Sequence, residues 1–504
     1  MQSNGFLLSF LNIAATFFVL LIGFGLLALI VMYFVDIRQT KHTIRRNYPV
    51  IGRFRYLFEK LGEFFRQYFF AMDREEMPFN RAERSWVYRA AKNENNTVAF
   101  GSTRDLRVPG TVFFVNTPFP TLDENAASVR QLVIGPDSEN PYAVSSIVNI
   151  SAMSYGALSK PAIRALSSGA HKAGAWLNTG EGGLSPFHLE GGCDLVFQIG
   201  TAKYGVRDAN GSLDDKRLAE IAAIPQVRMF ELKISQGAKP GKGGILPAVK
   251  VTPEIAAIRG IPAGQASISP NRHPEIASNA ELLDMIAHIR AVTRKPVGLK
   301  TVLGGSGWIS EFLEEIRQRG PASAPDFFTL DGGDGGTGAS PMALMDNVGL
   351  PLRESLPLLI DELLRFGLKD RIKVIASGKL ITPVEVAWAL CVGADFINTA
   401  RGAMFALGCI QAMQCNKNTC PTGITTHDKD LQKGLVPADK AERVAHYLNS
   451  LTHDVCVIAH SVGVREPREL NRQHARIVTD NGTSRMLSDL YPAPPVLWSE
   501  PASH

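Results

Sequence analysis

Cysteine is scarce in this 504-residue chain, and long runs of basic residues are missing. Only six cysteines occur, and three of them lie close together, at Cys409, Cys415 and Cys420. A secreted disulfide scaffold has denser and paired cysteines, so we expect a reducing compartment and one local cysteine cluster. The formal net charge is only +5. Without a clustered basic face, a nucleic-acid-binding function is excluded.

A dinucleotide-binding fingerprint is also missing. No G-x-G-x-x-G follows a first strand with an acidic residue about 20 positions further on, so we expect no nicotinamide site. Disorder is not indicated, because apolar residues make up 45% of the chain and charged residues 20%, as in an ordinary globular protein. The length allows several domains, or one α/β barrel with extensions.

Charge is absent from Met1 to Val35, and the segment is strongly apolar from Phe6 onward. About 30 residues of helix span ~45 Å, which exceeds the hydrocarbon core of a bilayer. A signal peptide has a basic start and a small-residue cleavage site. This chain has no basic residue at its start and no clear cleavage site after the apolar run. The sequence therefore predicts a single transmembrane anchor at residues 1–36.

A basic segment follows the anchor, with Arg38, Lys41, Arg45, Arg46, Arg53 and Arg55. This excess of positive charge predicts that the next domain stays in the cytoplasm, in a single-pass protein of the inner (cytoplasmic) membrane. Residues 54–70 have the pattern of an amphipathic helix. Its apolar face holds Phe54, Leu57, Phe58, Leu61, Phe65, Tyr68 and Phe69. This helix either packs on the catalytic domain or lies in the membrane interface, and the sequence leaves both interpretations open.

From Ser145 the chain alternates short β-branched runs with amphipathic stretches, which indicates a parallel sheet covered by helices. The strand candidates are Ser146–Ile150, Met229–Ile234, Ala266–Ile268, Val297–Val302, Phe327–Asp331, Lys373–Ala376 and Phe396–Thr399. The helix candidates are Asn279–Val292, Trp308–Gln318, Glu354–Phe366 and Pro383–Val392. Nearly eight such units favour an α/β fold of the TIM (β/α)8 barrel type.

Two glycine-containing loops follow the last two strand candidates: Ser377-Gly378 and Arg401-Gly402. Loops at these positions form the usual phosphate site of such a barrel. Glycine has no Cβ, so the backbone can approach an anion there. Ordinary tight turns would look the same, and the two loops alone do not separate the alternatives. We expect the second loop to start a helix from Arg401 to Met413, with Cys409 near its end.

Four segments carry distinctive motifs: Ser151–Ser159 (SAMSYGALS), Asn178–Gly183 (NTGEGG), Lys233–Gly244 (KISQGAKPGKGG) and Asp334–Pro341 (DGGTGASP). The cysteines have the spacing C-x5-C-x4-C and end in Cys420-Pro421. Together, these segments and the cysteine spacing resemble the FMN and iron–sulfur core of glutamate synthase. The resemblance extends from about Tyr88 to Val464. It implies an enzyme, a glutamate synthase-like oxidoreductase acting on CH-NH2 donors.

The resemblance also implies the site residues. It assigns Lys239 and Arg259 to the carboxylates of 2-oxoglutarate and Glu181 to proton handling at the substrate. FMN binding is assigned to Ala152, Met153, Ser154, Lys233, Gln236, Ser377, Gly378, Arg401 and Gly402. By residue type alone, the three cysteines could bind zinc, hold an iron–sulfur cluster or be core thiols. The resemblance implies the ligands of a [3Fe–4S] cluster.

Two positions depart from the family. The family has glutamine where this chain has Ile245, and glutamate where it has Lys242. The leading hypothesis is reductive amination of 2-oxoglutarate with ammonia, by hydride transfer from reduced FMN to the imine. The departures favour a second hypothesis, the same cofactors acting on another oxo acid or amine, as in methylglutamate synthases. A third is a membrane electron carrier without catalysis.

These observations predict four parts of the chain. Residues 1–36 form the anchor, 37–87 a basic and helical linker, 88–475 the barrel with the cluster loop 409–420, and 476–504 a C-terminal tail. The expected partners are a 2-oxo acid, the membrane and an electron donor. The sequence does not identify the donor, the ammonia source or the number of subunits, and a homo-oligomer is compatible with it.

Overall fold

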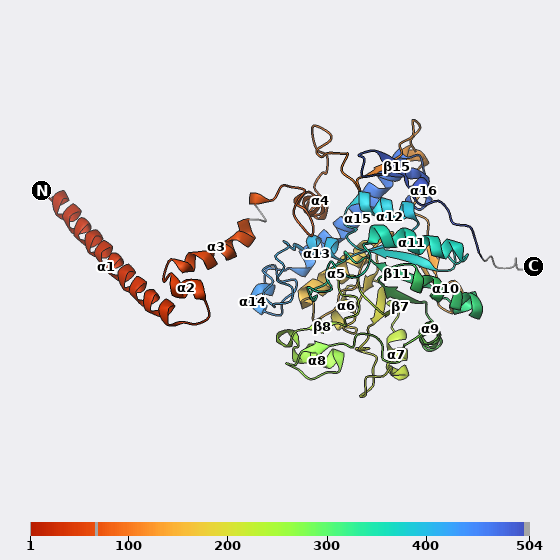
Figure 1. Cartoon of the computed structure of the whole chain (residues 1–504), viewed down its shortest axis with the longest axis horizontal. Helices are drawn as coiled ribbons and strands as arrows, with labels where there is room; N and C mark the ends of the chain where they lie inside the picture. Colours follow the sequence, from red (N-terminus) through yellow and green to blue (C-terminus); the bar gives the residue numbers. More distant parts are fainter. Residues whose placement is uncertain (1, 66–68, 498–504) are drawn as a thin grey trace, which may run out of the picture. The chain divides into compact units, whose positions relative to one another are not determined.

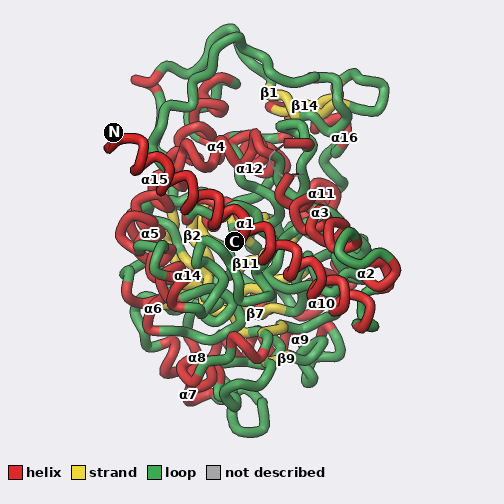
Figure 2. Tube along the Cα trace, turned by 90° about the vertical axis from the view of Figure 1, so that its left-hand side faces the viewer, coloured by secondary structure: helices red, strands yellow, loops and turns green. Residues whose placement is uncertain are grey.

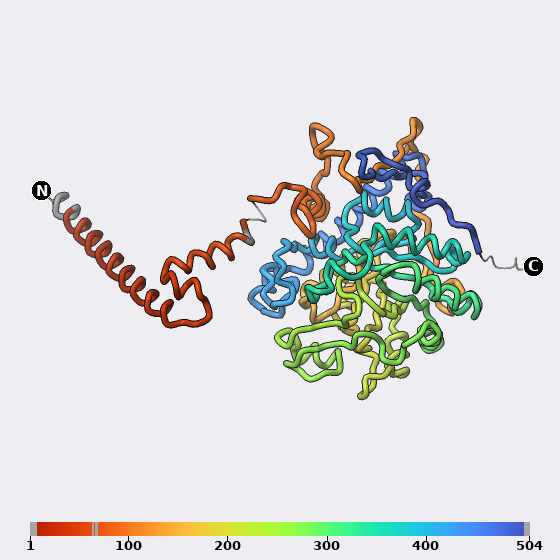
Figure 3. The backbone as a smooth tube through the Cα atoms, viewed as in Figure 1, coloured from red at the N-terminus to blue at the C-terminus, as the bar shows by residue number. Residues whose placement is uncertain are grey.

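The computed structural model describes residues 2–65 and 69–497. The chain divides into two compact units, residues 1–82 and 83–504 (Figures 1 and 3). The helices of the first unit are α1 (Gln2–Arg38), α2 (Thr43–Asn47) and α3 (Gly52–Phe65). By length and composition, residues Leu8–Arg38 of α1 are sufficient to cross a membrane, with a mean hydropathy of 2.8. The predicted amphipathic helix corresponds to α3; residues 66–68 of that prediction lie outside the described residues.

The second unit contains a closed barrel of eight parallel strands, which confirms the predicted fold class. In spatial order the strands are β10 (Val297–Thr301), β11 (Phe327–Asp331), β12 (Lys373–Ser377), β13 (Phe396–Thr399), β4 (Val148–Ile150), β5 (Leu177–Asn178), β6 (Leu195–Ile199) and β7 (Val227–Lys233). All residues of β6, β10 and β11 are buried. Such continuous burial is expected for parallel strands that are covered on both faces.

Helices surround the strands, as Figure 2 shows in red and yellow. The helices between the barrel strands are α5 (Lys160–Lys172), α6 (Pro186–Glu190), α7 (Asp215–Ala222), α8 (Pro253–Arg259), α9 (Asn279–Thr293), α10 (Gly307–Arg319), α11 (Leu352–Arg365) and α12 (Pro383–Val392). Those outside this series are α4 (Arg81–Ala91), α13 (Arg401–Leu407), α14 (Lys429–Gln432), α15 (Pro437–Ser461) and α16 (Leu487–Leu490). The four helices predicted between residues 279 and 392 are therefore present, within two residues at each end.

A β-hairpin packs at the N-terminal end of the barrel. It consists of β2 (Leu132–Ile134) and β3 (Tyr142–Val144). Its buried side chains share one hydrophobic core with residues at the starts of barrel strands, including Trp176 and Phe396, whose rings lie 5.2 Å apart. Since apolar side chains fill this end, the chemistry is left to the opposite, C-terminal end.

Segments from both ends of the second unit pair with each other. The strand β1 (Val112–Phe114) is antiparallel to β14 (Ala475–Val478), which pairs with β15 (Ser484–Met486). Figures 1 and 2 show this sheet at the end of the unit away from α7 and α8. Residues 475–486 thus belong to a sheet that begins near residue 112.

Three details of the predicted pattern differ from the structure. Ala266–Ile268 is not a barrel strand: β9 (Ser267–Ile268) pairs with β8 (Ile245–Leu246) in a short hairpin. The barrel strands β5 and β6 were not among the candidates. The helix predicted over Arg401–Met413 ends at Leu407, because Gly408 adopts a left-handed conformation with φ of 109°. Cys409 therefore follows the helix rather than lying within it.

Candidate active site

Predicted site residues from separate elements meet at the C-terminal end of the barrel. Glu181 follows β5, Lys233 ends β7, Lys239 lies in the next loop and Arg259 ends α8. The three cations lie close enough to lower the pKa of Glu181. Loops after parallel barrel strands open on one face, where this fold places its chemistry. The structure thus brings four of the predicted residues into one site.

The loop that carries Glu181 is oriented by side chains inside the barrel. Asn178 Oδ1 accepts a hydrogen bond from the N–H of Gly180 at 2.9 Å. The amide of Asn178 donates to Oε1 of the buried Glu231 at 2.9 Å, and Gln198 donates to the same oxygen at 2.6 Å. A connected set of buried hydrogen bonds of this kind favours one conformation. The position of Glu181 is therefore linked to the barrel interior.

The carboxylate of Glu181 lies among glycines and cations. Lys233 Nζ is 3.0 Å from Oε1. A Cβ at Gly244 would lie 2.6 Å from this oxygen, and a Cβ at Gly200 would lie 2.6 Å from the Cβ of Glu181. Burial opposes ionisation, but Lys233 and Lys239 outweigh it and hold the pKa of Glu181 below its ordinary value. The two glycines leave the space that the carboxylate occupies.

Arg259 is a buried cation with an unfilled donor. Its Nη1 donates to Ser267 Oγ at 3.2 Å, and Ser267 Oγ donates to the Tyr204 hydroxyl at 2.7 Å. The guanidinium also lies over the Tyr204 ring, 5.1 Å from its centre. Among the described residues, none accepts a hydrogen bond from the buried Nε. An unpaired buried donor is costly, and a carboxylate at this position would satisfy it.

The loop after β7 carries two lysines in different surroundings. Lys239 is 3% exposed, and its burial lowers its pKa to about 8, opposed by the negative charge of Glu181. Lys233 Nζ donates to Gln236 Oε1 at 2.9 Å, and Gln236 Nε2 donates to the carbonyl of Gly336 at 3.3 Å. Lys233 and Gln236, both predicted flavin ligands, are thus joined to the glycine-rich loop after β11.

The other predicted flavin residues lie at the end of β12, at the start of α13 and in the loops after β4 and β12. Ser377 Oγ donates to Asp331 Oδ1 at 2.9 Å. Arg401 Nη2 donates to the carbonyl of Asp334 at 3.1 Å, and burial lowers the pKa of Arg401 to about 10. Ala152, Met153 and Ser154 follow β4 directly. These loops share the face of the barrel on which Glu181 lies.

Gly402 has a packing role that the sequence does not reveal. A Cβ at Gly402 would lie 2.0 Å from the Tyr447 hydroxyl and 2.6 Å from Thr399 Oγ1. The contact lies between the start of α13 and α15, which packs beside it. The expectation that glycine at this position serves the approach of an anion is therefore not needed to explain Gly402.

Two glycine-rich motifs pack against each other. A Cβ at Gly237 would lie 1.8 Å from the carbonyl oxygen of Gly332, and a Cβ at Gly333 would lie 2.5 Å from that of Gly349. The N–H of Gly237 donates to Asp331 Oδ2 at 2.9 Å. Gly237 thus allows the loops after β7 and β11 to lie backbone to backbone, which positions the loop carrying Lys239, and Gly333 allows a close approach within the loop after β11.

The three clustered cysteines lie between α13 and α14. Their thiols are close enough to influence one another electrostatically. Burial raises the pKa of Cys409 to about 12, whereas hydrogen bonds from Thr422 and Thr425 outweigh burial and lower that of Cys420. Within residues 2–65 and 69–497, no three His, Cys, Asp or Glu side chains are arranged to hold one metal ion.

Lys250 lies beside the cysteines, although the sequence gives no signal for it. It is 2% exposed, and its Nζ donates to the carbonyls of Ala157, Cys415 and Thr425 at 3.2, 2.7 and 2.6 Å. All three ammonium protons are satisfied by backbone oxygens. A buried cation is stabilised by a nearby anion, and thiolates of a bound cluster would supply that charge.

Three further residues contact the site, although no sequence motif marks them: His273, Ser267 and Tyr204. His273 Nε2 lies 2.9 Å from the carbonyl oxygen of Lys233. The two departures from the family differ in exposure: Lys242 is exposed and Ile245 is half-buried. Ile245 directly follows Gly244, which lies against Glu181.

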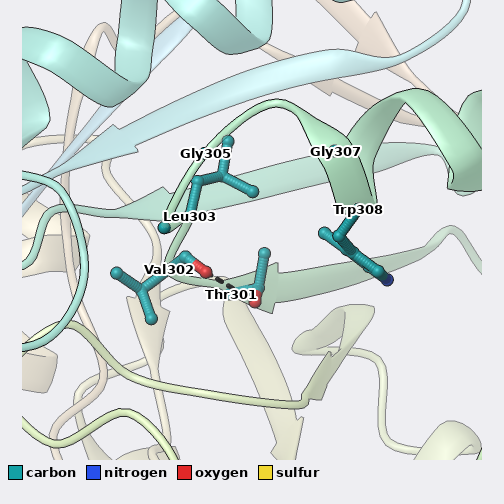
Figure 4. Close-up of a pocket in the computed structure, with 7 residues that line it drawn as sticks. Thr301, Val302, Leu303, Gly305, Gly307 and Trp308 are labelled. Atoms are coloured by element: carbon teal, nitrogen blue, oxygen red, sulfur yellow. Dashed lines mark hydrogen bonds between the residues drawn. The ribbon is translucent and has the colours of Figure 1, made fainter.

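A separate pocket of about 370 Å³ lies at the loop after β10 (Figure 4). Its lining residues are Thr301, Val302, Leu303, Gly304, Gly305, Gly307 and Trp308. Thr301 Oγ1 lies 2.8 Å from Ser235 Oγ, two residues after Lys233. The pocket therefore borders the loop of the site but contains none of the predicted site residues.

A family model described as a conserved region in glutamate synthase matches residues 116–465. The chain is 40% identical over 491 residues to the glutamate synthase large subunit-like protein YerD of Bacillus subtilis. This alignment covers 90% of this chain and 93% of that protein. It is 33% identical over 332 residues to the archaeal glutamate synthase [NADPH] of Methanocaldococcus jannaschii, covering 66% of this chain. The chain spans 61% of the length of that protein.

Among solved structures, the chain is similar to a mandelate oxidase variant, with 16% sequence identity and a TM-score of 0.44. The match covers 80% of this chain and 98% of that chain. An (S)-mandelate dehydrogenase chimera has 13% identity and a TM-score of 0.46, and covers 78% of this chain and 98% of its own.

Proposed function

Because this chain belongs to the glutamate synthase family and is an oxidoreductase of that kind, we propose that it reductively aminates 2-oxoglutarate with ammonia to form glutamate. The observation that carries the proposal is the convergence of Lys239 and Arg259 on Glu181 in one buried site. A 2-oxo diacid has two carboxylates, and two buried cations suit it. The unfilled Nε of Arg259, for which the described residues offer no acceptor, supports the same interpretation.

We propose that Arg259 and Lys239 bind the substrate carboxylates and thereby raise the proton affinity of Glu181. Before binding, three cations hold the pKa of Glu181 low. Two substrate carboxylates would neutralise Lys239 and Arg259, which leaves Lys233 as the remaining cation. Because an opposite charge favours ionisation, this loss raises the proton affinity of Glu181. Glu181 then accepts a proton from the attacking ammonia and returns it to the former oxo oxygen, which leaves as water as the imine forms.

FMN suits the charges at this end of the barrel. Its phosphate is an anion and the pyrimidine edge of its ring becomes electron-rich on reduction, so both prefer nearby cations. Arg401 is half-buried at the start of α13 and donates to the loop after β11, and Lys233 lies at the end of β7. When bound, reduced FMN supplies the hydride for the imine carbon. Ser377 at the end of β12, Gly378 after it and residues 152–154 in the loop after β4 would hold it.

A [3Fe–4S] cluster is proposed for Cys409, Cys415 and Cys420. Three thiols suit three irons, and buried Lys250 beside them favours an anionic group. To test both cofactors, we would purify the protein anaerobically, measure flavin and iron, and record the EPR spectrum of the oxidised protein. The expected result is FMN in stoichiometric amount with a three-iron signal. Zinc in place of iron would contradict the cluster.

We further propose that α1 anchors the protein in the inner membrane with residues 83–504 in the cytoplasm. The length and apolar composition of Leu8–Arg38 support this, together with the basic residues that follow. The proposed partners besides the substrate are the lipid bilayer and an electron donor.

A substrate assay tests the proposed reaction. Chemically reduced enzyme is mixed with 2-oxoglutarate and ammonia, and flavin reoxidation and glutamate formation are followed. Reoxidation that requires both compounds is the expected result. A second candidate, the same chemistry on another oxo acid or amine, rests on apolar Ile245 beside Gly244. It is favoured if reoxidation occurs only with other oxo acids. Electron transfer that does not depend on any oxo acid would leave only the hypothesis of a membrane electron carrier.

A further inference from the structure

Asp36 lies near the end of α1 and is completely buried, although most of α1 is exposed. Arg45 donates to Oδ1 from Nε at 3.0 Å and from Nη2 at 2.7 Å. Arg53 donates from Nε to Oδ2 at 2.8 Å and from Nη2 to Oδ1 at 2.9 Å. The N–H of Val50 donates to Oδ2 at 3.0 Å. We call Asp36, Arg45, Val50 and Arg53 the Asp36 joint.

Further contacts tighten the same region. Gln39 Nε2 donates to the carbonyls of Asp36 and His42 at 3.1 and 2.8 Å. The His42 and Tyr56 rings lie 4.8 Å apart. A Cβ at Gly52 would lie 2.8 Å from the carbonyl oxygen of Ile44, so α2 and α3 approach closely. The end of α1, the whole of α2 and the start of α3 are thus held together, which sets the direction in which α3 leaves α1.

The helix α3 carries an apolar face that is exposed. Phe54, Leu57, Phe58 and Leu61 have exposed fractions of 53, 48, 64 and 36%. The rings of Phe54 and Phe58 stack with their centres 6.4 Å apart. The following residues Phe69 and Phe70 are exposed as well. Such a row of aromatic and aliphatic side chains on one face of a helix is typical of a surface that is covered in the native environment.

The charges around this face are predominantly positive. Residues 36–63 contain seven Lys and Arg against three Asp and Glu, a formal charge of +4. Two of these seven basic residues belong to the Asp36 joint. The remaining basic residues include Arg46, Arg55 and Lys60, which lie near or within α3. Cytoplasmic leaflets are anionic and attract basic segments that lie within a Debye length. An apolar face with basic neighbours, directly after a membrane-length helix, therefore suits the surface of such a leaflet.

We propose that α3 lies in the cytoplasmic interface of an anionic bilayer, with Phe54 and Phe58 toward the acyl chains. The Asp36 joint turns the chain from the spanning helix α1 into the plane of the membrane. The two arginines neutralise Asp36 where it meets the boundary, so that its carboxylate is not left unpaired at the edge of the hydrocarbon. This inference rests on the proposed function of α1 as an anchor.

Photo-cross-linking in the full-length protein tests the proposal. A photoreactive phenylalanine analogue replaces Phe58, Glu59 or Phe18, one at a time, in vesicles of phosphatidylcholine and phosphatidylglycerol. Phe58 lies on the apolar face, Glu59 is its immediate neighbour on the other face, and Phe18 lies in the middle of α1. Lipid adducts are expected at positions 18 and 58 and not at 59.

Each other outcome has a defined meaning. Adducts at position 18 without lipid adducts at 58 would overturn the proposal for α3 and leave the anchor intact. Cross-links from position 58 to residues 83–504 or to a second copy would identify a protein surface as the cover instead. Absence of lipid adducts at 18 would contradict the anchor itself.

The variant D36N tests the joint. Asparagine keeps the shape but loses the charge that holds both arginines, so the lipid adduct at position 58 should fall by about fivefold or more, while that at 18 persists. The variant E59Q, which changes a carboxylate on α3 outside the joint, serves as the matched control. An unchanged yield at position 58 in D36N would overturn the role of the Asp36 joint.

Discussion

Arg259 is a buried cation of the site with an unpaired donor. Its Nε has no acceptor among the described residues, and burial lowers its pKa from the ordinary value. Charge-assisted hydrogen bonds contribute about 1.5–3 kcal/mol each. Replacing Arg259 by Ala should therefore lower kcat/KM for 2-oxoglutarate by about ten- to a hundredfold, even if one bond is lost. Steady-state kinetics would measure this decrease.

The control for Arg259 is Arg272→Ala. Arg272 donates to the backbone carbonyls of His273, Pro274 and Ile276, and within the described part of the chain these bonds do not reach Glu181, Lys239 or Arg259. Flavin content and the cluster spectrum should stay unchanged in both variants. Equal kinetics in the Arg259 variant and the natural protein would contradict the assignment of Arg259 to a substrate carboxylate.

The lowered pKa of Lys239 leads us to expect that kcat/KM for the oxo acid depends on pH. Burial lowers its pKa to about 8, so it carries its proton below this pH and loses it as the pH rises further. A neutral Lys239 cannot pair with a carboxylate, and kcat/KM for the oxo acid should fall as the pH rises through about 8, since kcat/KM reports the free enzyme. In Lys239→Arg, which keeps its charge, this fall should disappear. A profile that is identical in the two proteins would exclude Lys239 as its cause.

Lys250 should matter for the cluster rather than for the substrate. Its ammonium joins the loop containing Cys415 to the loop after β4 through Ala157. In Lys250→Met the three carbonyls lose their donor, so we expect less iron per chain and a lower midpoint potential of the remaining cluster, because a buried positive charge is lost. Iron analysis and EPR-monitored titration would measure these changes. Exposed Lys242→Met is the control, and equal iron and potential in both variants would contradict a role for Lys250.

At the scale of elements, regular patterns could be predicted and short elements could not. Strands β10 to β13 and helices α9 to α12 are long enough to be recognised from their composition, and they have nearly their expected bounds. Strand β5 has two residues, which is too short for any period to appear. β9 has the composition of a strand, and only its pairing with β8 excludes it from the barrel. The end of the helix after β13 could not be predicted, because it depends on the left-handed conformation of Gly408.

The packing of loops against each other explains part of the glycine content and yields a prediction. In Gly237→Ala the new Cβ would meet the carbonyl oxygen of Gly332 at 1.8 Å, and backbone atoms cannot move aside as a side chain can. Overpacking costs about 1–3 kcal/mol or more. We expect a lower Tm and weaker 2-oxoglutarate binding, because Lys239 lies two residues away. Gly305→Ala, where a Cβ would meet open space, should leave both unchanged. An unaltered Tm in Gly237→Ala would contradict the packing.

The sequence could predict which residues form the site, but not the contacts that they make. The motifs named Glu181, Lys233 and Lys239, and the barrel brings them together because strand-end loops share one face. The partners that orient the site, such as Glu231 behind the Glu181 loop and Tyr204 beside Arg259, come from distant positions with no motif. Contacts between residues far apart in sequence depend on register and rotamers, which the pattern of single residues does not contain.

At the scale of the whole molecule, the orientation of the anchor decides where the chemistry occurs. The first described charges after the apolar part of α1 are Asp36, which is neutralised in its joint, and then a series of cations beginning with Arg38. Basic residues next to a span are retained in the cytoplasm. A protease added to inverted inner-membrane vesicles should therefore digest the barrel unit, whereas the same protease added to intact spheroplasts should not. Deleting residues 1–36 should loosen membrane binding, although α3 retains part of it if it lies in the interface. Immunoblotting of the digests measures the protease result. Flotation on a density gradient measures the membrane binding of the truncated protein. Digestion from the periplasmic side alone would reverse the orientation, and it would also place the reducible cluster cysteines in an oxidising compartment, where thiols of this kind are prone to form disulfides.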